Sequence, residues 1–168
     1  MNYHDIKHCD MLNGSGLRTV LFVSGCSNKC PGCHNPETWD ADSGIEFTEL
    51  SMNEILDSLN NDYISGLTIS GGDPFYKQNI DEVLNIVLKV KSLYPNKSIW
   101  IYSGYTMEYL YGRDGVSMKI LDNIDVLVDG KFIKDLKDSN LHYRGSSNQR
   151  VINVHESISS GIIHTIDV

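Results

Sequence analysis

The sequence has little positive charge and no long apolar run. Its 168 residues include 14 Lys and Arg against 22 Asp and Glu, which gives a net charge of −8. Without a basic excess to neutralise phosphates, neither a nucleic acid nor an anionic membrane surface is expected as the main partner. No stretch approaches the roughly 18 apolar residues of a membrane span. Met1–Asp10 is polar and lacks the apolar stretch of a secretory signal.

Linkers, internal repeats and low-complexity segments are also missing, so we expect a single domain over residues 1–168. That length is short of the roughly 250 residues that a complete (β/α)₈ barrel needs. It still suffices for a core, since a chain of about 150 residues buries about 68–70% of its unfolded surface.

Cysteines are few and unevenly placed. Three of the four, Cys26, Cys30 and Cys33, lie close together, and Cys9 stands apart. Disulfides of secreted proteins tend to close long loops, which three adjacent thiols cannot do. We therefore expect a cytoplasmic protein whose cysteines serve as metal ligands or reactive thiols.

Short apolar runs alternate with segments of helical periodicity. Helices are predicted from a capping box at Ser51 and Glu54 to about Asn61, and from about Asn79 to Tyr94. Shorter helical pieces are predicted at Met107–Leu110 and Met118–Leu121. The predicted strands are Arg18–Val23, Gly66–Ser70, Ser98–Tyr102, Asp125–Val128 and Arg150–Val154. This rhythm predicts an α/β fold, a partial (open) TIM-like βα barrel with a mainly parallel sheet of about five to six strands.

Unusual loop sequences follow four of these strands in turn. In parallel sheets, functional residues gather where strands end. The sequence therefore predicts one shared site, built from Cys26, Gly71-Gly72-Asp73, Ser103-Gly104 and Asp129.

The cysteine loop, Cys26 to Cys33, has the spacing C-x₃-C-x₂-C. Thiolates favour iron–sulfur clusters, zinc or copper(I). A cubane cluster held by three cysteines leaves one iron open to a substrate or cofactor. Three alternatives are weighed against it: a zinc site completed by His34 or Cys9, a redox pair at Cys30 and Cys33, and a c-type haem site at Cys30–His34. The open cluster accounts best for all three cysteines.

At this spacing and place, the loop resembles that of the radical S-adenosylmethionine enzymes. The resemblance implies a [4Fe–4S] cluster on Cys26, Cys30 and Cys33, with S-adenosylmethionine on the open iron. The family's glycine-glycine-acid motif, which binds the methionyl amino group, corresponds to Gly71-Gly72-Asp73. The usual acid is Glu, one methylene longer than Asp73. Where many members have an aromatic residue, this chain has Pro31, so Gly32, Cys33 and His34 are expected on the adenine side.

Further stretches follow in an order that resembles the activating proteins of anaerobic ribonucleoside-triphosphate reductases, which are small glycyl-radical-enzyme activases. These stretches are Asn13–Arg18, Asn35 with Thr38-Trp39, Ser70–Pro74, Tyr102–Tyr105, Val128–Phe132 and Arg144–Arg150. The resemblance implies reductive cleavage of S-adenosylmethionine to a 5′-deoxyadenosyl radical, which abstracts a glycine hydrogen from the large reductase subunit. Ser103, Asp129 and Lys131 become candidates for the ribose and carboxylate, and the electron donor is expected to be flavodoxin-like.

Two other functions stay open at this point. One is activation of another glycyl-radical enzyme, such as pyruvate formate-lyase; the other is a non-catalytic zinc or iron–sulfur binding module. Several site residues also have ordinary structural readings: Ser103-Gly104 and Asp129–Lys131 as turns, Arg144 and Arg150 as surface charges, and Trp39 as core. A sheet too short to close as a barrel would leave one side free for a loop of the partner.

Overall fold

The computed structural model describes all residues, 1–168, around one seven-stranded sheet. Four strands at its centre, β2, β4, β5 and β6, run parallel, while β1, β3 and β7 pair antiparallel at its edges. The strand order is β3-β1-β2-β4-β5-β6-β7. The bounds are β1 Asn2–Asp10, β2 Arg18–Val23, β3 Ile45–Glu46, β4 Gly66–Gly71, β5 Ser98–Tyr102, β6 Val126–Asp129 and β7 Arg150–Asn153.

The α/β class and the parallel centre are confirmed, and the sheet is open rather than closed. The strand count was predicted too low, because β1 and β3 were not foreseen. β1 escapes prediction because its buried residues, Tyr3, Ile6 and Asp10, do not alternate with exposed ones. Irregularities in its pairing with β2, between Tyr3 and Asp5 and between Lys7 and Asp10, shift which side chains face inward.

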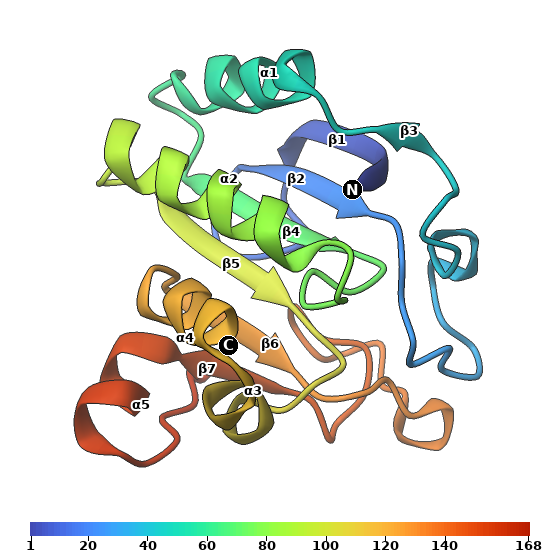
Figure 1. The fold of residues 1–168 in the computed structure, drawn as a ribbon. Helices are drawn as coiled ribbons and strands as arrows, with labels where there is room; N and C mark the ends of the chain where they lie inside the picture. The colour runs from blue at the N-terminus through green and yellow to red at the C-terminus, as the bar shows by residue number, and fades with distance from the viewer.

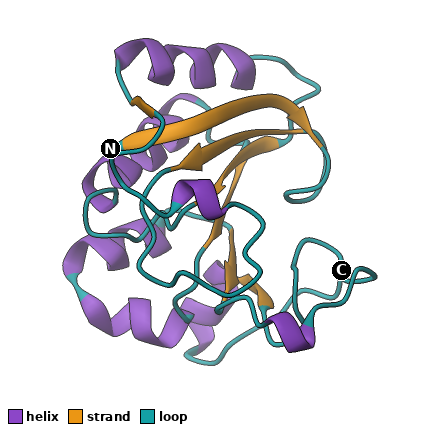
Figure 2. Cartoon of the chain, turned by 90° about the vertical axis from the view of Figure 1, so that its right-hand side faces the viewer, coloured by secondary structure: helices purple, strands orange, loops and turns teal.

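Five helices connect or follow the strands, and none has the length and apolar character needed to cross a bilayer. Figure 1 shows α1 and α2 beside β2, β4 and β5, with α3 and α4 lower down near β6. Figure 2 looks from the side to which the parallel strands of Figure 1 point, and there loops dominate the view. The bounds are α1 Glu49–Leu59, α2 Ile80–Leu93, α3 Met107–Arg113, α4 Gly115–Asp122 and α5 Val154–Ser160.

Several predicted boundaries are wrong: α3 and α4 are longer than expected, β4 ends one residue later, β6 is shifted by one residue, and two further differences change how an element begins or closes. Helix α1 begins earlier than expected: Thr48 is its extended N-cap residue, and the backbone N–H of Thr48 donates to Ser51 Oγ at 3.2 Å. The cap is thus formed by Thr48 with Ser51, not by Ser51 with Glu54. At the other end of the chain, Val154 opens α5 instead of closing β7. In both places the sequence suggested the element and misplaced its end.

Apolar residues cover both faces of the sheet. The larger cluster includes Leu21, Ile69 and Ile101 of the strands and Val83 and Val87 of α2, all fully buried. Helices thus shield one face, while the other face carries a small cluster of Trp100, Val126, Val128 and Val151, against which Tyr102 and Tyr143 pack. Because both faces are covered, the loops at the carboxyl ends of the parallel strands remain as the place for a site.

Arg18, at the start of β2, is a fully buried cation at the opposite end of these strands. No carboxylate pairs with it; its five N–H donors are met by oxygens instead. Nε donates to Thr68 Oγ1 at 2.7 Å, Nη1 to Ser15 O and Ser98 Oγ, and Nη2 to Leu67 O and Ser98 O. Burial lowers the pKa of Arg18 to about 10, so the side chain is still charged at neutral pH. A single guanidinium therefore joins β2, β4 and β5 at this end.

We expect Arg18→Lys to lower the free energy of unfolding by about 2 kcal/mol, because an ammonium has three donors for five acceptors and cannot match their planar layout. Urea unfolding of the metal-free protein measures the change. Arg113→Lys is the matched control: its half-buried guanidinium contacts Phe75 O and Asp114, and about 0.5 kcal/mol is expected there. An equal loss in both variants would contradict the special role of Arg18.

Candidate functional site

A cavity opens at the carboxyl ends of the parallel strands. It brings together most of the residues that sequence reasoning selected, which are Cys26, Cys30, Cys33, Gly71, Gly72, Asp73 and Ser103. The predicted Gly104 lines it too. Sequence reasoning did not assign the seven other lining residues, which are Asn28, Trp39, Ser70, Tyr102, Gly130, Phe132 and Gln149. Several of these lie inside motifs already noted, so their position at strand ends was the available signal.

The cysteine loop leaves the end of β2 and is anchored at its start. Gly25 N–H donates to Thr38 O at 2.7 Å, and Cys26 N–H donates to Trp39 O at 3.1 Å. Farther along, Cys33 N–H donates to Cys30 O at 3.0 Å. All three thiols are free and half-buried, and burial raises the pKa of Cys26 and of Cys30.

Gly71 and Gly72 bring the end of β4 against the beginning of that loop. Gly71 has φ of +99°, and a Cβ there would lie 2.6 Å from the backbone of Val23. A Cβ on Gly72 would lie 2.5 Å from Gly25 O. Gly72 N–H donates to Val23 O, and Asp73 N–H donates to Gly25 O at 2.8 Å. The paired glycines are thus required by contact between backbones, besides lining the cavity.

Asp73 is 1% exposed and its carboxylate is surrounded by donors. Oδ1 accepts from Phe75 N–H and Oδ2 from Gly104 N–H, each at 3.0 Å. Ser103 Oγ donates to both oxygens, and Asn28 Nδ2 donates to Oδ2 at 3.1 Å. Burial raises the pKa of Asp73 to about 6, against the pull of these hydrogen bonds. The carboxylate joins the end of β4, the end of β5 and the cysteine loop.

Asp129 and Lys131 lie outside the lining of the cavity. Asp129 is 1% exposed and does not line the cavity; it accepts from Met107 N–H at 2.8 Å and from Arg150 Nε at 2.9 Å. Arg150 also pairs with Glu108, and hydrogen bonds to Asp129 and Glu108 raise the pKa of Arg150. Lys131 does not line the cavity either, although its neighbours Gly130 and Phe132 do.

Of the predicted adenine-side residues, Cys33 lines the cavity, whereas Gly32 and His34 do not. Gly32 and His34 are exposed, and the His34 ring meets the Phe132 ring edge-on with centroids 5.8 Å apart. Gly32 has φ of +76°, which glycine adopts without strain. Pro31 is exposed as well. This side of the cysteine loop is therefore open.

The donor set suits a multi-atom cluster. Three thiols line one cavity, yet no three His, Cys, Asp or Glu side chains are close enough together to hold a single ion. Each cysteine of an iron–sulfur cubane binds a different iron, so wider spacing is natural there, whereas structural zinc needs four ligands around one point. Two buried donors among the lining residues, Trp39 Nε1 and Tyr102 Oη, have no partner in the protein. Such atoms are available to a bound group.

Comparison with known proteins agrees with this chemistry. The family described as "4Fe-4S single cluster domain" matches residues 12–152. The anaerobic ribonucleoside-triphosphate reductase-activating protein of Escherichia coli K12 is 45% identical over 153 residues, 90% of this chain and 97% of that protein. The protein of the same name from Enterobacteria phage T4 is 46% identical over 151 residues, 90% of this chain and 93% of its own length.

The chain belongs to the family of anaerobic ribonucleoside-triphosphate reductase-activating proteins. The Vibrio cholerae member is 44% identical over 151 residues and covers 89% of the chain. Since these matches span nearly all of both chains, the whole fold and not just the cysteine loop is shared.

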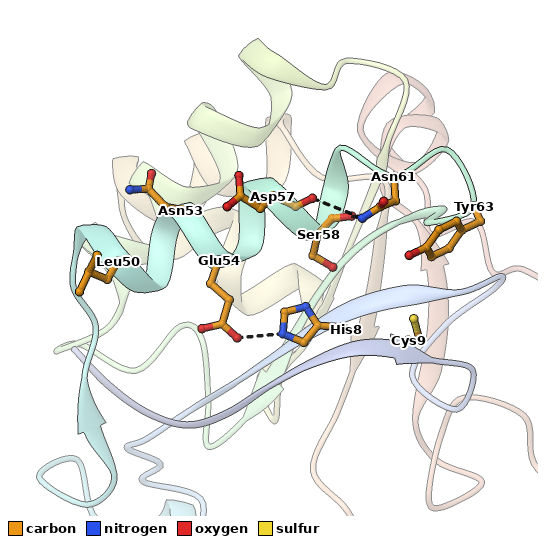
Figure 3. Close-up of a pocket in the computed structure, with 9 residues that line it drawn as sticks. All are labelled: His8, Cys9, Leu50, Asn53, Glu54, Asp57, Ser58, Asn61 and Tyr63. Carbon is orange, nitrogen blue, oxygen red and sulfur yellow. Dashed lines mark hydrogen bonds and ion pairs between the residues drawn. The ribbon is translucent and has the colours of Figure 1, made fainter.

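Cys9 is the one thiol of this activating-protein family member that lies away from the site. It is exposed on β1, where neighbouring Asp10 pairs with Arg18 at the amino end of β2. Tyr3, at the other end of β1, pairs with Val23 beside the cysteine loop, and six residues of strand span roughly 20 Å. Figure 3 shows Cys9 at the end of a groove between β1 and α1, where His8 and Glu54 are 2.8 Å apart. Cys9 therefore cannot reach the other three thiols.

Proposed function

We propose that this protein activates an anaerobic ribonucleoside-triphosphate reductase by generating its glycyl radical, as a radical S-adenosylmethionine enzyme consisting of the single domain 1–168. The observation that carries the proposal is the meeting of three thiols from one loop with Gly71, Gly72 and Asp73 in one cavity. Relatives about 45% identical over nine-tenths of the chain are named for activating that reductase. Four free cysteines suit a reducing cytoplasm.

Cys26, Cys30 and Cys33 would hold a [4Fe–4S] cluster through their thiolates. The backbone at Gly71 and Gly72, with Ser103, would orient S-adenosylmethionine beside it. Bound together, these groups would supply one-electron radical chemistry that removes a hydrogen atom from a backbone glycine of the reductase. Gly32, Cys33 and His34 lie on the open side, where they would border the adenosine moiety. Asp129 and Lys131 would lie near the bound cofactor. Asp129 would help to position the site by accepting a hydrogen bond from Met107 N–H at the start of α3.

The open sheet supports the choice of a protein as the substrate. Its central parallel strands, with helices along one face, correspond to part of a βα barrel, and we take the fold as a partial TIM-like barrel on that ground. A barrel that does not close leaves the cavity accessible from the side. A loop of the large reductase subunit could then reach it, and a flavodoxin-like donor could supply the electron.

Anaerobic reconstitution tests the proposal. We expect roughly four irons and four sulfides per chain, as a [4Fe–4S] cluster requires, and cleavage of S-adenosylmethionine under dithionite. A doublet glycyl signal in electron paramagnetic resonance is expected after mixing with the reductase. One tightly bound zinc without cleavage would favour the binding-module alternative. A signal with pyruvate formate-lyase and none with the reductase would identify the other activase function.

A further inference from the structure

The Arg144–Gln149 segment has a structural task that the proposed chemistry does not explain. It runs beside the loop that follows β6, and five hydrogen bonds join the two, one of them from Asp138 N–H to Gly145 O. Gln149 Nε2 donates to Gly130 O at 3.0 Å, and Asn148 Nδ2 donates to Lys131 O at 2.8 Å. Ile133 N–H donates to Ser146 Oγ, and Ser147 N–H donates to Leu136 O. The loop after β6 is therefore held along most of its length.

Gln149 is the centre of this arrangement, since both ends of its amide are used. Oε1 accepts from Gly145 N–H at 2.9 Å and from Ser146 N–H at 3.1 Å, while Nε2 reaches Gly130 O. Arg144 Nη1 donates to the backbone carbonyl of Gln149 at 2.9 Å. One side chain thus fixes the turn of its own segment and ties that turn to the end of β6.

The other side of the Gly130–Lys134 loop lies against the cysteine loop. Phe132 lines the cavity together with Cys30 and Cys33, and its ring packs on His34. A Cβ on Gly32 would lie 3.4 Å from Lys134 Cδ and 3.5 Å from the Phe132 ring. On its far side the same ring touches Gly145, where a Cβ would be 3.1 Å away. Phe132 is therefore enclosed between the Arg144–Gln149 segment and the cysteine loop.

The cysteine loop needs such external support because it has little structure of its own. From Ser27 to His34, its one backbone–backbone hydrogen bond joins Cys33 N–H to Cys30 O. Lys29 adopts a left-handed φ of +43°, which is unfavourable outside glycine. Cys26 is fixed at the end of β2 by Trp39, but Cys30 and Cys33 are several residues from that anchor. Their position depends on what packs against them.

We propose that the Arg144–Gln149 segment holds Cys30 and Cys33 in place through the Gly130–Lys134 loop, with Gln149 as the positioning residue. The contacts themselves carry this inference; its meaning for a bound cluster rests on the proposed function. The segment lies between β6 and β7, so it is the last part of the chain that contributes to the site.

Thiol reactivity of the metal-free full chain tests the proposal. Gln149→Glu keeps the acceptor for Gly145 and Ser146 but turns the donor to Gly130 O into a second oxygen. Pulse labelling with a thiol reagent, read cysteine by cysteine by mass spectrometry, should show Cys30 and Cys33 reacting roughly three to ten times faster, the factor for one lost hydrogen bond. Cys9 and Cys26 should keep their rates. No bound group is present in this measurement, so a lost ligand contact cannot produce the change.

Two further variants keep the experiment decisive. Gly145→Ala retains every hydrogen bond and displaces the Phe132 ring, so it should also speed labelling of Cys30 and Cys33. Asn153→Ala is the matched control: it removes the cap of α5, where Asn153 accepts from Glu156 N–H, without touching the Gly130–Lys134 loop. It should leave all four rates unchanged.

Unchanged rates at Cys30 and Cys33 in both Gln149→Glu and Gly145→Ala would overturn the proposal. A uniform rise at all four cysteines would overturn it too, since that marks general destabilisation. The proposed function fails separately, through reconstitution with zinc or absence of cleavage in the unaltered protein. Faster loss of iron to a chelator in Gln149→Glu than in Asn153→Ala would extend the result to the loaded protein.

Discussion

Replacement of Cys26, Cys30 or Cys33 by Ala is expected to abolish cluster loading and cleavage of S-adenosylmethionine, whereas Cys9→Ala should leave both unchanged. Each of the three thiols lines the same cavity. Cys9 lies roughly 20 Å away from Tyr3, the end of β1 that is next to this cavity. A cluster with two protein ligands is expected to be lost, because no other Cys or His lines the cavity to replace the third. Iron and sulfide content, the visible absorption of the cluster and yield of methionine measure the outcome.

Loss of fold would mimic this result and must be separated from it. The three thiols are half-buried, so Ala should cost the metal-free protein at most about 1 kcal/mol, within the range of ordinary substitutions. Urea unfolding without metal checks this directly. Equal loss of cluster in Cys9→Ala would point to a fourth cysteine ligand and would contradict the open-iron site. Retention of cleavage in any of the other three variants would contradict the assignment of that ligand.

The sequence predicted the parallel centre of the fold well because short runs rich in apolar residues mark its strands. Arg18–Val23 and Ser98–Tyr102 were placed with their correct bounds, as strands buried on both faces predict. The antiparallel edges were harder. β1 is polar and half-exposed, and irregular pairing removes its alternation, so nothing in its residues marks it as a strand. The tail after β7 likewise gave no sign of α5.

The site residues likewise fall into two groups, those that the sequence places and those that it does not. Cys26, Asp73 and Ser103 follow parallel strands, so the chain order alone places them together. Asp129 is the last residue of the parallel strand β6, but its carboxylate accepts from Arg150, which faces it from the antiparallel partner β7. That pairing depends on register between distant segments, which a single sequence does not reveal. Gln149 stands one residue before β7, so the same pairing of β7 with β6 brings it to the cavity.

The second large effect is expected at Asp73. Asp73→Asn should lower the free energy of unfolding by roughly 3 kcal/mol, because an amide presents NH₂ to groups that are themselves donors. Placed at Oδ2, it would face Gly104 N–H and the Asn28 amide; placed at Oδ1, it would face Phe75 N–H. Cleavage of S-adenosylmethionine should fall at least a hundredfold, since a misplacement of about 1 Å can cost that factor.

Asp114→Asn is the matched control for Asp73→Asn. Asp114 also accepts a backbone N–H, that of Ser117 at 2.7 Å, but at the cap of α4 away from the cavity. Its loss should cost at most about 1 kcal/mol, as Asn is itself a good cap, and cleavage should not change. If Asp73→Asn kept the full free energy of unfolding and lost only cofactor binding, Asp73 would be a direct ligand and not a tie between segments.

Asp73→Glu is a second test of whether Asp73 binds the cofactor directly or ties the segments of the site together. The glycine-glycine-acid motif that Gly71-Gly72-Asp73 resembles usually carries Glu, so a carboxylate that binds the methionyl ammonium should tolerate the longer side chain. In this chain the Asp73 carboxylate is fully buried. It already accepts hydrogen bonds from four donors, which belong to Phe75, Gly104, Ser103 and Asn28. An added methylene there forces strain of about 1–3 kcal/mol and moves the acceptors away from those donors. We therefore expect Asp73→Glu to be destabilised and impaired in cleavage, and a fully active Asp73→Glu protein would show that the hydrogen bonds of Asp73 are dispensable to the site.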